Sequence, residues 1–382
     1  MQIAGQQAAE AWKISFIGHS SLNGRGDGMQ LALKDHFLFV GHLAKAGTTI
    51  LDVANPASPR VVYQQVIPPH VHTHKVQIVD DLLLVNYEQF GAGTPERTGF
   101  QILDISTPLQ PQEIGFFSTG GKGVHRMWYA GGRYVYLSAV PEGFSDQIFL
   151  IADISDPTSP QEVARWWVPG MWTAGGETPT WPSDRRYAAH HAVVSEDRAY
   201  LGFWDAGAFI LDISDPSKPS QIAHLSWPAA ESGNTHTALP LPERSLLIVT
   251  DEAITDECQE GPRHVRVVDI TEEGKPQDIS KFPVPQGNFC QRGHRFGPHN
   301  LHENRPGSFV SDEMIFVTYF NAGLRVVDLS VPERPEEIAH YIPATPEGQQ
   351  AAQTNDVFVA ENGLIYISDR INGGIDILEL QL

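Results

Sequence analysis

The sequence predicts an all-β fold, a seven-bladed β-propeller in which each blade is a four-stranded antiparallel sheet. The prediction rests on three features. A motif of two aliphatic residues, an acid and a third aliphatic residue recurs every 49 to 59 residues, a period suited to a four-stranded blade. Prolines follow six of the seven copies and turn the chain into a further strand. The seventh copy ends the chain after its third strand, which leaves an outer strand missing.

The N-terminal segment has the pattern of that missing strand. Residues 12–18 begin with Trp12 and alternate apolar and polar side chains, so we expect them to pair with the last blade and to close the ring. Closure also has a physical motive, because an open apolar edge strand promotes aggregation. The chain then forms one domain, 1–382, with blades at about 28–68, 74–118, 125–168, 190–227, 236–283, 299–342 and 355–382.

The repeat resembles that of the LVIVD repeat family of β-propellers. The residues that carry the resemblance are the aliphatic runs around the motif acids, from about residue 12 to the end of the chain. The acids are Asp52, Asp104, Asp153, Asp212, Asp269, Asp328 and, in the last copy, Glu379. The resemblance implies the propeller fold and no particular activity, because propellers host many functions.

Composition excludes several classes of partner. The chain has 26 Lys and Arg against 46 Asp and Glu, a net charge of −20, so we expect no nucleic-acid partner. No run approaches the roughly 18 apolar residues of a membrane span, and we expect no membrane association. Residues 1–11 lack a basic start and an apolar stretch, so we predict a cytoplasmic protein without a secretory leader.

The two cysteines, Cys258 and Cys290, fall in predicted loops. Two cysteines are too few for a disulfide framework, and we do not expect them to bind a metal.

Histidine is the feature that points to chemistry. When the copies are aligned on their first hairpin, five of the seven have a histidine just before the innermost strand, and Met29 and Asn355 take that position in the first and last copies. The first strand of each blade lines the central channel, so the five imidazoles should converge at one end of the axis. They are His74, His125, His190, His236 and His299.

Converging imidazoles favour a transition metal. Neutral imidazole is a common ligand of iron, copper, zinc and nickel, and several rigid strands can hold a set of them with open coordination positions. We therefore predict a metal centre with His72 as an additional ligand, iron or copper being favoured and zinc or manganese possible. His302 is a further ligand or a supporting group, and for His191 we expect a partner on the neighbouring blade. The alternative is a polar channel lining without metal.

Acids at the end of the second strand should lie on the same face. Glu88, Asp205 and Asp251 occupy this place, as does Asp369, and each could orient an imidazole or act as a general base. Capping of loop turns is the equally weighted alternative. Arg126, with Arg185 and Arg186, is a candidate to bind a carboxylate or phenolate of a substrate. The alternative, which we slightly favour, is that these arginines form surface ion pairs.

The loops on that face are long and carry aromatic side chains. Trp172, Trp181, Tyr187 and Phe296 would suit an aromatic substrate, or would pack the loops onto the ring.

These features favour a metal-dependent oxidoreductase acting on a small aromatic or anionic molecule. Its geometry is distantly similar to that of carotenoid-cleavage dioxygenases and of the selenium-binding protein and methanethiol oxidase group, whose propeller histidines hold iron or are linked to copper. A metal-dependent lyase or isomerase and a non-catalytic interaction scaffold are the alternatives. The sequence has no phosphate-binding loop, HExxH motif or nucleophile elbow.

Overall fold

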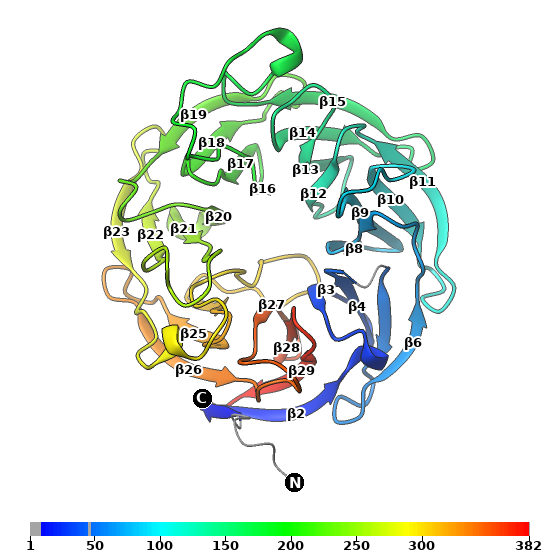
Figure 1. Ribbon diagram of the computed structural model, residues 1–382, viewed down its shortest axis with the longest axis vertical. Helices are drawn as coiled ribbons and strands as arrows, with labels where there is room; N and C mark the ends of the chain where they lie inside the picture. The colour runs from blue at the N-terminus through cyan, green and yellow to red at the C-terminus, as the bar shows by residue number, and fades with distance from the viewer. Residues whose placement is uncertain (1–8, 45–46, 382) are drawn as a thin grey trace.

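The computed structural model describes residues 9–44 and 47–381, and within these ranges the chain is all-β, without α-helices. Figure 1 shows the sheets arranged in a ring about a common axis, with β3, β8, β12, β16, β20 and β27 innermost. The only helical turns among the described residues are four 3₁₀ turns, Leu22–Gly24, Thr173–Gly175, Pro242–Arg244 and Phe289–Gln291.

Three of the antiparallel sheets follow the chain in order, so that the first strand is innermost and the fourth is outermost. Their strands are β3 (Gly28–Lys34), β4 (Phe37–His42), β5 (Thr49–Asp52) and β6 (Arg60–Gln64); β16 (His191–Ser195), β17 (Arg198–Gly202), β18 (Ala208–Asp212) and β19 (Ser220–Leu225); and β20 (Thr235–Leu241), β21 (Leu246–Asp251), β22 (Val265–Asp269) and β23 (Gln277–Lys281).

A fourth sheet has nine strands, because two consecutive groups are joined where Gly123 pairs with Glu88. The first group also contains a two-residue strand, β7, that pairs with the end of β9. The strands are β7 (Val71–His72), β8 (Val76–Val79), β9 (Leu82–Gln89), β10 (Gly99–Asp104) and β11 (Gln112–Ser118), then β12 (Gly123–Trp128), β13 (Tyr134–Val140), β14 (Ile148–Asp153) and β15 (Gln161–Trp166).

The N-terminal residues contribute to the last two sheets. β2 (Ile14–Ser20) pairs with β29 (Gly374–Leu380), the final strand of the chain, beside β28 (Leu364–Asp369) and β27 (Thr354–Val359). β1 (Glu10–Trp12) pairs instead with β26 (Glu336–Ile342), beside β25 (Leu324–Asp328) and β24 (Met314–Thr318). Trp12, expected at the start of the strand on the last sheet, therefore lies on the neighbouring one, because Lys13 has a positive φ of 54° and breaks the strand.

The segment after His299 differs from the repeat. We expected a regular innermost strand there, but the chain makes only the isolated bridges Leu301 to Val317 and Ser308 to Ala360. Pro306 and Gly307 lie between these bridges, and Pro306 has no backbone N–H to donate to a sheet ladder.

The repeated aspartate has a local structural reason. At the end of the third strand its carboxylate accepts the backbone N–H two residues on, as Asp104 does from Ser106 at 2.7 Å and Asp212 from Ser214 at 2.9 Å. This turn, followed by the prolines, starts the outer strand. The hydrogen bond holds the pKa of each of these carboxyls below its usual range.

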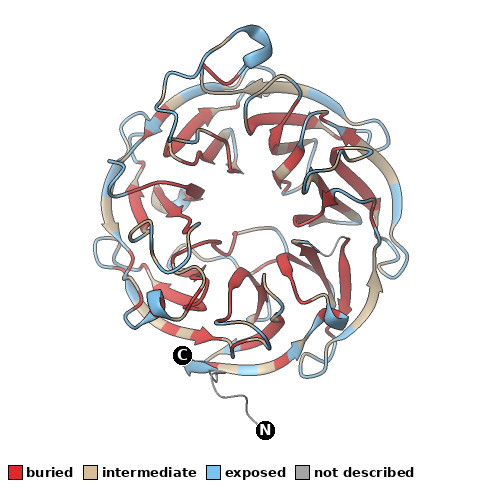
Figure 2. Ribbon diagram, viewed as in Figure 1, coloured by how far each residue is buried: buried red, intermediate tan, exposed pale blue. Residues whose placement is uncertain are grey.

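The core consists of the faces on which neighbouring sheets pack. Phe39 and Ile50 of one sheet, for example, share an apolar cluster with Leu83 and Val85 of the next, and all four are essentially buried. Burying each such side chain contributes about 1.5–3 kcal/mol. Figure 2 shows the consequence, buried inner strands and partly exposed outer strands, so the residues on the axis sit on a rigid frame.

A disulfide joins Cys258 to Cys290, which the sequence did not predict. It ties the loop after β21 to the loop before β24. No helix among the described residues is long and apolar enough to span a membrane.

Candidate functional site

Six imidazoles form a continuous arc on the axis. The ring centroids of successive members are 4.1 to 4.9 Å apart, in the order His72, His74, His125, His190, His236 and His299. His74, His125, His190 and His236 come from the start of an innermost strand or from the residues just before it, whereas His72 lies in β7 and His299 precedes an irregular segment. The predicted convergence of the histidines is confirmed, and His72 belongs to the arc.

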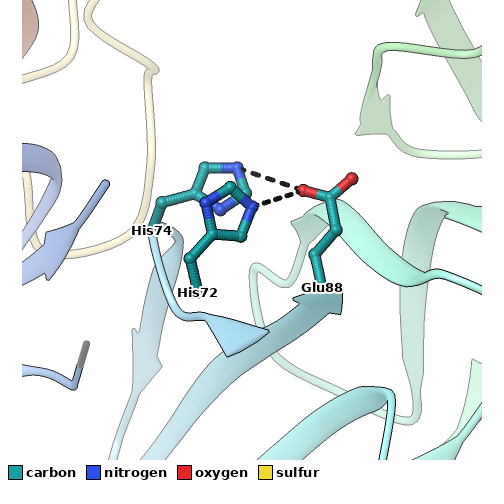
Figure 3. Close-up of side chains that lie close together, drawn as sticks. All are labelled: His72, His74 and Glu88. Carbon is teal, nitrogen blue, oxygen red and sulfur yellow. Dashed lines mark hydrogen bonds and ion pairs between the residues drawn. The ribbon is translucent and has the colours of Figure 1, made fainter. Parts of the chain in front are cut away.

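One end of the arc surrounds Glu88, which lies near the end of β9 and is nearly buried. Its Oε2 is 2.7 Å from Nε2 of His72, 2.9 Å from Nδ1 of His125 and 3.9 Å from Nε2 of His74. Figure 3 shows the rings of His72 and His74 directed at this one oxygen. We call His72, His74, His125 and Glu88 the Glu88 half of the arc.

Burial opposes ionisation of Glu88, but the charge and hydrogen bonds of His125 and His72 outweigh it. They hold the pKa of the Glu88 carboxyl well below its usual range. Glu88 is therefore a carboxylate at neutral pH.

The other end of the arc contains His190, His236 and His299 with Glu252, and we call it the Glu252 half. Its three imidazoles are anchored through Nδ1. These nitrogens lie 3.3 Å from the backbone oxygen of His236, 2.7 Å from Oγ1 of Thr237 and 2.6 Å from the backbone oxygen of Asn355, respectively. A carbonyl can only accept, so in His190 and His299 the proton sits on Nδ1 and the lone pair is on Nε2.

Glu252 follows β21 and faces the same space. Its Oε1 is 3.6 Å from Nε2 of His299 and also pairs with Arg295 at 3.1 Å and Arg370 at 3.7 Å. Ligand atoms of His190, His236 and Glu252 lie within 4.8 Å of one another, as do those of His72, His74 and Glu88.

These donors suit a transition ion. Metal-ligating histidines usually donate their other ring N–H to a carbonyl or carboxylate, as His190 and His299 do here. Burial, the largest cause, and nearby positive charges hold the pKa values of His190, His236 and His299 well below the usual range, so all three are neutral donors. One contact competes: Nη1 of Arg126 lies 3.3 Å from Nε2 of His236.

Two buried polar groups on the axis have no hydrogen-bond partner among the described residues. They are Nε2 of His74 and the side-chain amide of Asn355, both at most 1% exposed. Asn355 takes the histidine position in the last copy of the repeat. Buried polar groups are normally satisfied, so each indicates a place on the axis for a ligand atom or a water.

His125 connects the two halves. Its Nδ1 faces Glu88 at 2.9 Å and its Nε2 faces Nε2 of His190 at 3.0 Å. Because Nδ1 of His190 donates to a carbonyl, Nε2 of His190 accepts and Nε2 of His125 donates.

Arg126, a candidate to bind an anion, is instead buried in an ion pair, although not at the surface as the alternative had it. It is 1% exposed beneath the imidazoles, and it donates to Oδ1 of Asn300 at 2.9 Å and to Oε1 of Glu303 at 3.2 Å. Lys75 and Asp356 are buried nearby; burial lowers the pKa of Lys75 and raises that of Asp356.

Arg185 and Arg186 are engaged in ion pairs, with Asp205 and Asp146 respectively, which agrees with the alternative that we weighed for them.

Of the acids that we proposed, the structure brings only Glu88 to the imidazoles. Asp205 accepts the backbone N–H of Arg186 at 2.7 Å, so it holds a loop. Asp251 accepts from Oγ1 of Thr235 at 2.9 Å and pairs with Arg266 at 3.4 Å, and burial raises its pKa to about 6. Asp369 accepts the backbone N–H groups of Ile371 and Gly373 in its own loop and of Gln353 before β27.

Two other histidines behave as structural groups. His191 lies 3.4 Å from Oγ1 of Thr237 on the neighbouring sheet, as predicted. Both ring nitrogens of His302 are used, at 2.7 Å from the oxygen of Phe309 and 3.2 Å from the N–H of Val359.

The aromatic residues beside the imidazoles were not those that we proposed. Trp181 and Tyr187 stack on each other at 4.4 Å and belong to a loop cluster. Phe90, Trp204 and Phe320 instead lie 4.8, 5.4 and 4.7 Å from His72, His190 and His299. Each follows the second strand of its repeat, at a site where the sequence analysis considered only acids.

Comparison with known proteins agrees with this fold. Four segments, residues 25–64, 131–167, 188–224 and 309–342, match the LVIVD repeat. None of the curated proteins compared with the sequence matches it.

Several solved structures are similar in fold. The N-terminal domain of Nup159 is 12% identical over 98% of this chain and 97% of its own, with a TM-score of 0.58. The periplasmic gluconolactonase PpgL of Pseudomonas aeruginosa is 12% identical over 89% and 93%, with a TM-score of 0.57. The computationally designed protein Ika8 is 11% identical over 95% and 98%, with a TM-score of 0.51. At this identity the similarity concerns fold alone.

The ring of antiparallel sheets and these similarities define a β-propeller. The four matched segments show that the chain contains repeats of the LVIVD family.

Proposed function

We propose that the protein is a metal-dependent oxidoreductase that acts on a small organic molecule at the histidine arc. The observation that carries the proposal is the orientation of the Glu252 half. His190 and His299 are fixed through Nδ1, and ligand atoms of His190, His236 and Glu252 lie within 4.8 Å of one another, so these three could hold an ion. A shell of imidazole and carboxylate suits iron or copper, with zinc or manganese as alternatives, whereas purely structural zinc usually has sulfur ligands.

In this proposal the bound ion supplies Lewis acidity and one-electron chemistry toward dioxygen. The chain supplies the rest. Trp204 and Phe320 flank the imidazoles and form apolar walls for an aromatic substrate. Arg295 and Arg370 share the single carboxylate of Glu252 and favour an anionic group at the same place. Glu88, ionised beside His125, fixes the orientation of that ring.

We also infer that the ring has seven blades and that β2 closes it. The pairing of β2 with β29 supports closure by both ends of the chain. The nine-stranded sheet can be divided at the single pairing of Gly123 with Glu88, and each part then has four main strands. Counted in this way, the sheets number seven.

Elemental analysis of the purified protein beside the double variant His190→Ala/His299→Ala tests the function. We expect about one or more equivalents of iron or copper in the parent and a loss in the variant, with oxygen uptake in a substrate screen. His36→Ala, at an exposed position far along the chain from the arc, is the control and should keep the metal. Circular dichroism confirms that each variant is folded.

The other two functions predict different results. Zinc or manganese without oxygen uptake would favour a lyase or isomerase, in which a side chain such as Glu88 removes a proton. A protein that binds no metal even on titration would contradict both enzymes and leave an interaction scaffold, with which LVIVD repeats are compatible.

The cytoplasmic location remains a prediction, and the disulfide argues against it. Bridges such as Cys258 to Cys290 persist in oxidising compartments and are rare in the cytosol. Alkylating free thiols at the moment of cell lysis tests this: blocked cysteines would place the working protein in an oxidising compartment, and labelled cysteines would support the cytoplasm.

A further inference from the structure

We propose that the Glu88 half is a second metal site and that His125 bridges the two ions as an imidazolate. The inference rests on the proposed function only for the ion in the Glu252 half. The second ion has its own ligands, His72, His74, Glu88 and Nδ1 of His125. Imidazole and carboxylate donors suit a divalent ion such as Cu²⁺ or Zn²⁺.

The spacing of the donors fits a single ion. Donor atoms around a four-coordinate ion with bonds of about 2.0–2.2 Å lie about 3–3.6 Å apart. In the Glu88 half, Oε2 of Glu88 lies 2.7, 2.9 and 3.9 Å from the facing nitrogens of His72, His125 and His74, so small side-chain shifts bring all four to this range. Side-chain exposures between 2% and 20% leave little water to compete with these donors.

The hydrogen bonds around the site direct two ring nitrogens at the carboxylate. Nδ1 of His72 lies 3.1 Å from the backbone oxygen of Leu43 and must donate to it, so Nε2 is the atom that faces Glu88. Nδ1 of His125 also faces Glu88, because Nε2 of that ring donates to His190. In the metal-free protein both facing nitrogens donate an N–H to the carboxylate, and a bound cation would replace these two protons and leave the nitrogens as ligands.

His74 requires one adjustment. The Asn86 amide donates to the oxygen of Val124 at 2.8 Å and faces Nδ1 of His74 at 3.1 Å. Its nitrogen also lies 3.4 Å from the oxygen of His125 and can donate its second hydrogen there. Because the amide nitrogen cannot accept, the His74 ring must also tilt away from it before Nδ1 can carry the proton, and the unpartnered Nε2 then becomes a ligand.

His125 is the residue that joins the two sites. Its two ring nitrogens face different halves, Glu88 at 2.9 Å and His190 at 3.0 Å. Two ions bound to these nitrogens would lie about 6 Å apart, given bonds of about 2.0–2.1 Å and the width of the ring. Two ions would place positive charge beside the buried side chains of Lys75 and Arg126. When His125 loses its second ring proton, the negative imidazolate offsets part of this charge.

Copper titration of the metal-free full-length protein tests the inference, because Cu²⁺ reports both stoichiometry and spin coupling. The parent should bind two equivalents, and its electron paramagnetic resonance signal should rise with the first equivalent and fall with the second, since an imidazolate bridge pairs the spins. Glu88→Gln should bind one equivalent with full signal. His125→Ala should bind two equivalents without pairing. His36→Ala should behave as the parent.

The outcomes separate this inference from the proposed function. One equivalent in the parent, unaffected by Glu88→Gln and lost in His190→Ala/His299→Ala, would overturn the second site and leave the oxidoreductase standing. Two equivalents whose signals never pair in the parent would overturn the bridge. No bound copper would overturn both proposals. Melting temperatures of each variant, measured without metal, show whether a loss of binding reflects unfolding.

Discussion

The two halves of the histidine arc contain the same side chains and differ in what surrounds them. In the Glu88 half a single carboxylate oxygen gathers three imidazoles. In the Glu252 half the imidazoles are fixed by a hydroxyl and two carbonyls, while the carboxylate is shared with two arginines.

This difference assigns different chemistry to each half. Fixed tautomers make the Glu252 half a preformed set of nitrogen ligands, whereas in the Glu88 half ring N–H groups donate to one carboxylate, and a cation would have to replace their protons. The sequence position of a histidine alone does not distinguish them, because both halves use the same register of the repeat.

The largest difference that we predict is in the response of the metal-free protein to acid. Burial keeps His190, His236 and His299 neutral in the folded state, with pKa values well below their unfolded value of about 6.5. The free energy of unfolding is therefore not reduced by these histidines above about pH 6.5. Below about pH 6.5 each histidine lowers it by up to about 1.4 kcal/mol per pH unit, because the unfolded chain takes up the proton that the folded protein excludes. Urea unfolding between pH 7.5 and 5 measures this slope.

Variants in each half show which part of the pH dependence of stability belongs to that half. His236→Gln should make the slope between pH 6.5 and 5 shallower. The pKa of Glu88 is depressed in the folded state, so its contribution is present above its unfolded pKa of about 4.3 and is lost only below it. Glu88→Gln should therefore alter the profile near pH 4. An unchanged slope in His236→Gln would contradict the neutral, buried state of this ring.

The disulfide should support one half only. Cys258 and Cys290, 32 residues apart, join the loops that follow Glu252 and precede His299. Replacing both by serine should cost about 2–4 kcal/mol of unfolding free energy, because the open chain regains loop entropy. Metal affinity should fall in the Glu252 half and not at Glu88. Equal losses at both halves, or none in stability, would show that the bridge does not organise this face.

A smaller effect should come from the anchor of a single ring. Thr237→Val removes the oxygen that holds Nδ1 of His236 at 2.7 Å, and loss of such a supporting hydrogen bond typically lowers metal affinity about 10–100-fold. Thr250→Val is a matched control, since Thr250 is equally buried on the paired strand and its hydroxyl has no partner among the described residues. Similar affinities for the two variants would show that the anchor is unimportant.

Much of this architecture could be predicted from local pattern. The aspartate of each repeat predicts the turn that it caps, and the histidine before each innermost strand predicts convergence, because both depend on residues close in sequence. Trp12 was misplaced because a single residue with positive φ, Lys13, separates two strands.

Other features depend on packing between distant segments. Glu252 directly follows Asp251, the acid that the sequence analysis proposed at the end of the second strand. Only the direction of the chain after β21 shows that Glu252, and not Asp251, faces the imidazoles. Arg126 points inward to Asn300 and Glu303, residues more than 170 positions away. The pairing of Cys258 with Cys290 likewise requires two long loops to meet.

Anomalous diffraction tests the central claim most directly. Crystals of the protein grown with iron or copper, measured on both sides of the metal's absorption edge, should give a peak within about 2.0–2.2 Å of Nε2 of His190, of a nitrogen of His236 and of a Glu252 oxygen. Crystals grown with metal that show no peak on the axis, or a peak at surface histidines alone, would contradict the account.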